Sequence, residues 1–186
     1  ANTGIYYIYD FEELICGTGS DSITMNTAGS FTNGITGTST TGNTLAGPSG
    51  TVAWALTDDY DGSIDPGTPT SFTNIQTLAG NGTDTLTGVA AGSIWEVNSA
   101  DGGNITITAL ATTFTGMDNI TGGASGGDTF TFGASGSISG TLSGGASGSN
   151  EIVGPSGTVA WGISSDNVGT INTGISTDFT LIQTLS

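Results

Sequence analysis

The phrase GPSGTVAW occurs twice in this chain, at residues 47–54 and again at residues 154–161. A second phrase with the pattern F-x-x-I-Q-T-L follows each copy, at residues 72–78 and 179–185. Both phrases are separated from their second copies by the same offset of 107 residues. Self-similarity at a fixed offset is the sequence signature of repeat architectures, in which each repeat folds as one supersecondary unit. The chain is therefore expected to consist of stacked, recurring units.

A shorter period runs inside the 107-residue repeat. Fainter versions of the second phrase, with an apolar residue at every third position, begin at Ile8 and Phe114. The four starting points are separated by 64, 42 and 65 residues, which are close to whole multiples of about 21 residues. Clusters such as TVAW, IWEV and ITIT lie between turns rich in Gly, Ser and Asn, which is typical of short strands. We predict an all-β fold, a β-solenoid (β-helix) of about nine coils of roughly 21 residues each.

The predicted domain organisation is one continuous solenoid. An N-terminal apolar β segment covers residues 1–10, a first super-repeat covers residues 11–116, and a second, incomplete super-repeat covers residues 117–186. Tandem immunoglobulin-like β-sandwiches are the alternative, because about 100 residues form one such domain. The shorter period and the dense Gly–Ser corners favour the solenoid.

The charge of the chain excludes several classes of function. The 186 residues include 16 Asp and Glu but no Lys, Arg or His, for a net charge of −16. Nucleic acids and anionic membranes bind proteins through Lys and Arg, so neither is an expected partner. Ser-His-Asp triads, Schiff-base lysines and His-ligated zinc sites lack their key residue. No apolar run is long enough to span a membrane, and the single cysteine, Cys16, cannot form an intrachain disulfide. We expect no enzymatic activity, the remaining option being polysaccharide cleavage by paired carboxylates.

Carboxylates around glycine turns suggest calcium as a cofactor, because Ca²⁺ prefers clustered carboxylate oxygens. The densest group surrounds Gly62, and its candidate ligands are Asp58, Asp59, Asp61 and Asp65. Three further candidates follow glycine-rich turns, namely Asp21, Asp84 and Asp128. The alternative interpretation is that these aspartates cap turns by accepting backbone N–H groups. The second 107-residue copy keeps one carboxylate of the Asp58–Asp65 group, which favours that alternative.

The segment GGASGGDTFTF at residues 122–132 is similar to the RTX nonapeptide GGxGxDxUx, in which U is a large apolar residue. The chain from about residue 8 onward resembles the β-helical repeats of large bacterial surface and secreted adhesins, the haemagglutinin-like and RTX-like repetitive proteins. This resemblance implies an extracellular or cell-surface protein with a β-helical fold and an adhesive or fibrous role.

Regularly placed apolar residues define the expected core and the expected docking surfaces. The predicted core residues are Trp54, Trp95, Trp161, Phe72, Ile75, Leu78, Phe114, Phe179 and Ile182. Solenoids have open ends with unpaired strand edges, so apolar residues near the ends are expected to dock between copies. The predicted self-assembly residues are Ile5, Tyr6, Tyr7, Ile8, Tyr9, Leu181 and Leu185.

These features predict a structural subunit of an extracellular fibre, such as a biofilm, matrix or adhesion filament, that assembles head to tail. The expected partners are copies of the chain itself, with other cell-surface or matrix components as further partners. One alternative is a calcium-stiffened binding module of a giant adhesin. Another is an ice-binding face with threonine rows through Thr106 and Thr108 or Thr129 and Thr131. Candidate N-glycosylation sequons occur at Asn81, Asn104 and Asn119.

Overall fold

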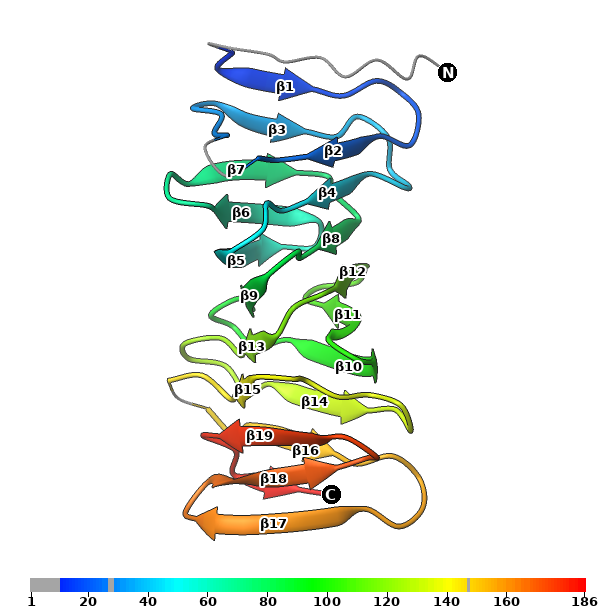
Figure 1. Cartoon of the computed structure of the whole chain (residues 1–186), viewed down its shortest axis with the longest axis vertical. Coiled ribbons are helices and arrows are strands. Elements are labelled where there is room, and N and C mark those ends of the chain that lie inside the picture. The colour runs from blue at the N-terminus through cyan, green and yellow to red at the C-terminus, as the bar shows by residue number, and fades with distance from the viewer. Residues whose placement is uncertain (1–10, 27–28, 147) are drawn as a thin grey trace.

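A computed structural model gives the fold of the chain and describes residues 11–26, 29–146 and 148–186. These residues form β-strands and no helix. The strands make two sheets, one of 11 strands and one of 9, and they stack along the long axis of the molecule (Figure 1). The prediction of an all-β chain is therefore confirmed. The segment at residues 1–10, predicted to dock between copies, lies outside the described residues.

The two sheets draw their strands from the whole length of the chain. In spatial order, the 11-stranded sheet contains β1 (Glu13–Ile15), β3 (Gly34–Thr36), β7 (Thr70–Thr73), β6 (Asp61–Asp65), β5 (Thr51–Asp58), β9 (Thr83–Thr87), β13 (Asn119–Thr121), β15 (Thr141–Ser143), β19 (Ser176–Thr180), β18 (Val168–Asn172) and β17 (Ala160–Ser165). The 9-stranded sheet contains β2 (Ser22–Thr24), β4 (Thr44–Ala46), β8 (Thr77–Ala79), β12 (Ala111–Thr115), β11 (Gly102–Thr106), β10 (Ile94–Ser99), β14 (Thr129–Phe132), β16 (Glu151–Val153) and β20 (Thr184–Leu185).

Short strands alternate between the two sheets along most of the chain, and most neighbouring strands are parallel. In β4 and β8 the sequence TLA is repeated, and the strands pair with Leu45 opposite Leu78. Both leucines are fully buried, whereas the flanking Thr and Ala side chains lie on the outer face. This alternation has the two-residue period of a β-strand with one buried face. Stacking such strands in parallel aligns the apolar residues into one continuous core between the sheets.

Three antiparallel segments interrupt this pattern. We call them the first meander (β5, β6 and β7), the second meander (β10, β11 and β12) and the third meander (β17, β18 and β19). In each meander, the first strand leaves two empty strand positions between itself and the preceding strand of the same sheet. The next two strands fill these positions, and each runs antiparallel to the strand before it. The first and third meanders lie in the 11-stranded sheet and the second lies in the 9-stranded sheet. The structure therefore adds antiparallel units that the prediction of uniform coils did not include.

Each meander is held by one Trp, one Ile and one Phe on consecutive strands. In the first meander, Trp54 lies opposite Ile64 on β6, and the rings of Trp54 and Phe72 meet edge to face at 6.4 Å. The corresponding trios are Trp95, Ile105 and Phe114 in the second meander and Trp161, Ile171 and Phe179 in the third. Edge-to-face aromatic pairs add stability beyond the burial of their area. The 107-residue offset of GPSGTVAW is thus the distance between the first strands of two meanders in the same sheet.

The mostly parallel ladders bear on the two predicted architectures. Immunoglobulin-like sandwiches are built from antiparallel sheets, whereas the sheets of this chain are parallel except in the meanders. Two mostly parallel sheets are compatible with the predicted β-solenoid. They do not fit the sandwich alternative.

Every meander is followed by one residue with left-handed backbone geometry. Asn74, Gly116 and Leu181 come directly after the third strands and have φ angles of 57°, 64° and 57°. Glycine and asparagine adopt this geometry readily, whereas a residue such as leucine pays about 1–2 kcal/mol. Leu181 is 44% exposed, so burial offsets little of this cost.

Leu181→Asn is therefore expected to raise the free energy of unfolding by about 1 kcal/mol. The measurement is urea unfolding followed by circular dichroism. Leu110→Asn is the matched control, because Leu110 is also exposed but its φ angle is not positive. The control should change stability by less than about 0.5 kcal/mol. A loss of stability in Leu181→Asn would contradict the prediction.

Candidate functional site

Two buried aspartates each accept an indole N–H from the first strand of a meander. Nε1 of Trp54 donates to Oδ1 of Asp84 at 3.2 Å, and Nε1 of Trp95 donates to Oδ1 of Asp128 at 3.4 Å. All four residues are buried. A hydrogen bond to a charged group contributes about 1.5–3 kcal/mol. These pairs connect the first strand of a meander to its outer neighbour, because Asp84 lies near the start of β9 and Asp128 directly precedes β14.

The same aspartates also cap their own turns. The amide N–H of Asn81 donates to Oδ2 of Asp84 at 2.8 Å. Asp128 accepts the amide of Gly123 in its own turn, and it also accepts the amide of Ser93, which directly precedes β10, each at 2.8 Å. Sequence analysis predicted both aspartates as metal ligands with turn capping as the alternative. In the structure their oxygens take backbone and indole donors.

Burial dominates the acid–base properties of these two aspartates. It raises the pKa of Asp84 and of Asp128 above the ordinary value, and the hydrogen bonds from Trp54, Trp95 and the turn amides offset part of this rise. A carboxyl group with a raised pKa in the folded state stabilises the fold at low pH. That contribution is lost as the pH rises through the folded-state pKa.

A ladder of side-chain oxygens runs along the corner next to these turns. The amide of Asp21 donates to Oδ1 of Asn43 at 3.1 Å, and the amide of Asn43 donates to Oε1 of Gln76 at 2.9 Å. Because these corner amides lie outside the strand ladders, side-chain acceptors are needed to satisfy them. The same relay, at 2.9 and 2.7 Å, occurs at Asp128, Asn150 and Gln183.

Asp21 occupies the position of Asp84 and Asp128 in the first glycine turn but lacks their donors. Its Oδ2 is buried and has no hydrogen-bond partner among the described residues. A buried acceptor without a partner costs stability. Of the three aspartates that follow glycine turns, Asp21 is therefore the one with a buried oxygen that accepts no hydrogen bond among the described residues.

Burial, with a smaller contribution from Asp21, raises the pKa of the nearby Cys16 thiol, so the thiol is protonated at neutral pH.

The four candidate aspartates of the first meander do not share one site, because three lie at or beside the β5–β6 turn and Asp65 lies at the other end of β6. Oδ1 of Asp58 accepts the amide of Asp59, Oδ1 of Asp61 accepts the amide of Asn74, and Oδ1 of Asp65 accepts the amide of Gly67. Within residues 11–26, 29–146 and 148–186, no group of three or more His, Cys, Asp or Glu side chains is arranged to hold a metal ion. Calcium binding stays a prediction.

Asp59 joins the first meander to the second. Its carboxylate accepts the amides of Ile107, Ala109 and Leu110, at 2.8–2.9 Å, and the hydroxyl of Thr108. Partial burial raises the pKa of Asp59, but these hydrogen bonds outweigh it and lower the pKa below the ordinary value. A lowered folded-state pKa stabilises the fold above the unfolded-state pKa, and this contribution is lost only as the pH falls through the folded-state value. The Asp59 carboxylate is thus ionised at neutral pH.

The structure buries most of the residues predicted for the core. Trp161 is the exception, since it is only partly buried. The fully or nearly fully buried residues of that set are Trp54, Trp95, Phe72, Ile75, Leu78, Phe114, Phe179 and Ile182.

Outward hydroxyls form a row across the 9-stranded sheet, but the row is interrupted. Thr44, Thr77 and Thr113 lie in register on neighbouring strands. The row then continues through Asn104 and the charged Glu96, which breaks the surface of hydroxyls. Thr106, Thr129 and Thr131 are half-buried on the same sheet, and Thr108 contacts Asp59. Ice binding stays a prediction.

The three sequon asparagines differ in surroundings. Asn81 is exposed at a turn. Oδ1 of Asn104 accepts the hydroxyl of Thr113, and Oδ1 of Asn119 accepts the amide of Thr141. Asn81 is therefore the most accessible of the three.

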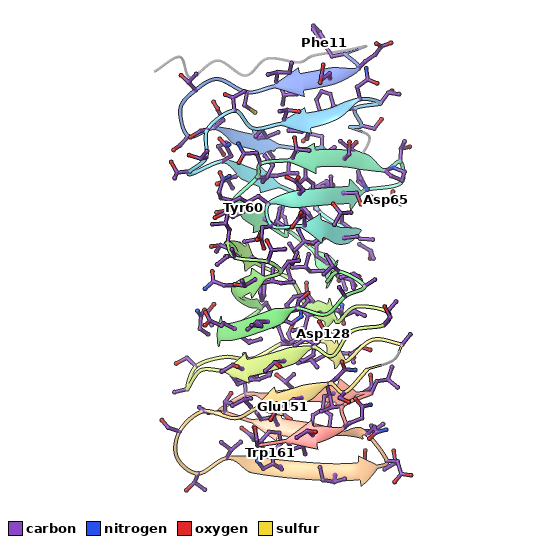
Figure 2. The ribbon with its side chains drawn as sticks, turned by 180° about the vertical axis from the view of Figure 1, so that it is seen from behind. Phe11, Tyr60, Asp65, Asp128, Glu151 and Trp161 are labelled. Carbon is purple, nitrogen blue, oxygen red and sulfur yellow. The ribbon has the colours of Figure 1, made fainter. Side chains whose placement is uncertain are left out.

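Both ends of the stack present apolar side chains. Phe11 is 60% exposed at one end, and Figure 2 shows it at the opposite end of the molecule from Trp161. At the Trp161 end, Ile163 is 63% exposed. Other exposed apolar residues near the ends are Ile15, Ile175, Leu181 and Leu185. Two of these, Leu181 and Leu185, belong to the predicted self-assembly set. Sequence analysis missed the others, although the position of Ile163 two residues after the repeated tryptophan was visible in the sequence.

No family model matches the chain, and neither a curated protein nor a solved structure shows significant similarity to it. None of the described residues forms a helix that is long and apolar enough to cross a membrane. The class defined by the fold is an all-β repeat protein with two mostly parallel sheets.

Proposed function

We propose that the chain is a β-solenoid and serves as a structural subunit of an extracellular fibre that grows by head-to-tail stacking. One comparison carries this proposal, namely the burial of the same sequence phrase in two places. In the first meander Trp54 and Leu56 are 1% and 3% exposed. At the equivalent positions of the third meander, Trp161 is partly exposed and Ile163 is 63% exposed. The described residues supply no strand over this surface of the third meander, and we propose that a second copy covers it.

The strand edges support the same conclusion. In the part of the chain that the structure describes, β5 pairs with β6 and β9 in the 11-stranded sheet, whereas β17 pairs with β18 alone. Unpaired edges with apolar side chains are templates for pairing with another chain. Because the exposed surfaces at the two ends differ from each other, their contact is heterologous and extends without closing.

The composition supports an extracellular or cell-surface setting. A chain without Lys or Arg offers no cleavage site to trypsin-like proteases. The stacked, repeated strands of the fold favour a mechanical role in a matrix or adhesion filament.

The purified chain is expected to form unbranched filaments. Parallel strands are about 4.8 Å apart, so sheets of 9 and 11 strands give an axial rise of about 50 Å per subunit. Since each copy carries a charge of −16, filament formation should increase between about 20 mM and about 500 mM NaCl as repulsion is screened. Electron microscopy and sedimentation velocity measure both effects. A chain that remains monomeric at every salt and protein concentration would overturn the proposal.

Two variants locate the assembly surface. Ile163→Asp places a charge on the exposed end and should abolish filaments, while Ile94→Asp is the matched control because Ile94 is 56% exposed on a sheet face. Deletion of residues 1–10 tests whether the apolar N-terminal segment takes part. Undiminished filaments after this deletion would exclude the segment from the contact.

A further inference from the structure

The loop between β6 and β7 contains the one Asp–Pro peptide bond of the chain, between Asp65 and Pro66. The nitrogen of Pro66 belongs to a tertiary amide without an N–H, and such a nitrogen accepts a proton more readily than a secondary amide does. The side chain of Asp65 carries a carboxylate, a group that acts as a nucleophile and forms covalent intermediates. A nucleophile and a leaving group thus adjoin the same carbonyl carbon.

The geometry of this loop holds the carboxylate beside the bond. Oδ1 of Asp65 accepts the amide N–H of Gly67 at 2.8 Å, and Gly67 has a φ angle of 124°. In this Asx turn the side chain bonds the backbone two residues on, which folds the carboxylate back over the peptide group between Asp65 and Pro66. Oδ2 of Asp65 accepts no hydrogen bond among the described residues. One oxygen is therefore anchored, and the other is free to react.

The third meander contains the same turn without the reactive groups. Oδ1 of Asn172 accepts the amide N–H of Gly174 at 2.9 Å, and Gly174 has a φ angle of 127°. The residue between them is Thr173, so this loop has neither the carboxylate nor the tertiary amide. The two loops share one geometry, and of the two the loop at Asp65 carries the groups that can react.

We propose that the bond between Asp65 and Pro66 is a self-cleavage site that opens in acid. Oδ2 of Asp65 attacks the carbonyl carbon of its own residue, and the new C–O bond closes a cyclic anhydride. The C–N bond to Pro66 breaks, its electron pair stays on the nitrogen, and the nitrogen takes a proton from the solvent. Water then opens the anhydride, which leaves an α-carboxylate on Asp65 and a free amine on Pro66. Water is the only co-reactant, and the residues that follow the bond, at positions 67–69, are exposed to it.

The surroundings of Asp65 leave protonation of the leaving nitrogen as the source of the acid dependence. Figure 2 shows Asp65 at the margin of the stack, and it is the last residue of β6. The neighbouring strands present uncharged residues there, because Ala53 on β5 pairs with Asp65 and β7 begins with Thr70. The other aspartates of the hairpin strands, Asp58 and Asp61, pair with each other at the opposite end of β6.

Cleavage at this bond leaves the two parts of the chain interlocked. Residues up to Asp65 contain β1 to β6, and residues from Pro66 onward contain β7 to β20. In the 11-stranded sheet β7 lies between β3 and β6, so a strand of the second part is flanked on both sides by strands of the first. The parts also meet where β5 pairs with β9 and where β4 pairs with β8. The buried rings of Trp54 and Phe72, one from each part, contact each other edge to face. The expected product is a two-chain protein that keeps the fold.

The test compares the folded chain with a peptide of residues 63–69, which has the same bond without the fold. Both are incubated between about pH 4 and about pH 7, at values where the circular dichroism spectrum of the chain matches its spectrum at neutral pH. Mass spectrometry under denaturing conditions should detect fragments of residues 1–65 and 66–186, at a rate that increases as the pH falls. The rate in the chain should exceed the rate in the peptide at least about tenfold, because the turn holds the nucleophile in place. An intact chain, or equal rates in chain and peptide, would overturn the proposal.

Two variants each introduce the residue type found in the third meander. Pro66→Thr removes the tertiary amide and Asp65→Asn removes the carboxylate, while both keep a side-chain acceptor for the turn. Each should reduce cleavage to the level of the other peptide bonds of the chain. Asp178→Asn is the control for charge removal at an exposed strand position and should leave the rate unchanged. Persistent cleavage in Asp65→Asn would show that the carboxylate is not the nucleophile.

Sedimentation velocity of the cleaved protein tests the interlocked product. Cleaved and intact chains should sediment alike at neutral pH, and urea should release the two fragments. Fragments that separate without denaturant would refute the interlocked product. Because cleavage is measured on the single chain, its outcome is independent of head-to-tail assembly.

Discussion

Trp95→Ala is expected to lower the free energy of unfolding by about 3–5 kcal/mol, the range for removing a fully buried large aromatic side chain. Trp95 is 0% exposed. Its ring stacks on Phe130 at 5.6 Å and meets Phe114 edge to face at 5.9 Å. The substitution also removes the donor of the buried Asp128 carboxylate. The variant therefore loses stability both from the cavity at Trp95 and from the missing hydrogen bond to the buried Asp128 carboxylate.

The matched control is Trp161→Ala, the same change at the equivalent position of the third meander. Because Trp161 is only partly buried and donates no hydrogen bond among the described residues, it should cost about 1–2 kcal/mol. Urea unfolding at a protein concentration where the chain is monomeric measures both. Equal losses in the two variants would show that the third meander is covered as fully as the second.

Gly103→Ala is expected to lower the free energy of unfolding by about 3 kcal/mol, at the upper end of what overpacking one methyl group costs. Gly103 lies on β11 opposite Val97. A Cβ atom at Gly103 would overlap the carbonyl oxygen of Glu96 and lie 3.1 Å from Cζ of Phe114. The obstacle is backbone on the neighbouring strand, so no side-chain rotation relieves it and the hairpin must separate.

Gly19→Ala is the control for the same added methyl group. Nothing lies within 4 Å of the position that its Cβ would occupy, so stability should change by less than about 0.5 kcal/mol. Thermal unfolding by calorimetry compares the two variants. A Gly103→Ala protein as stable as the Gly19→Ala protein would contradict the close strand approach at Gly103.

The sequence predicted the composition of the sheets better than their connections. Clusters such as TLA at residues 44–46 and 77–79 show the strand period directly, because one buried residue sits between two outward ones. The antiparallel meanders were not predicted, because β5 and β6 have the same alternating period as the parallel strands. The available signal was the short turn between them, where Tyr60 has a φ angle of 67°. Tyrosine is an uncommon residue for that geometry, so its identity gave no warning of a hairpin.

The candidate sites show the same limit. Asp58, Asp59, Asp61 and Asp65 are close in sequence, which suggested a shared ion. However, these aspartates lie on and between the antiparallel strands β5 and β6, and the carboxylate of Asp59 in the turn binds the second meander. The relation between Asp84, Asp128 and the tryptophans was equally hidden, because the partners are 30 and 33 residues apart. Spacing along a strand reports which face a residue occupies, but it does not report which strand becomes its neighbour.

The alternation of the meanders between sheets affects the straightness of the molecule. Each meander lengthens one sheet by two strands and leaves the other unchanged. The first and second meanders lie in opposite sheets, so they lengthen both sheets equally. The third meander makes the 11-stranded sheet longer than the other by two strands. The third meander therefore adds two strands to one face only, which favours a bend toward the 9-stranded sheet at that end of the stack.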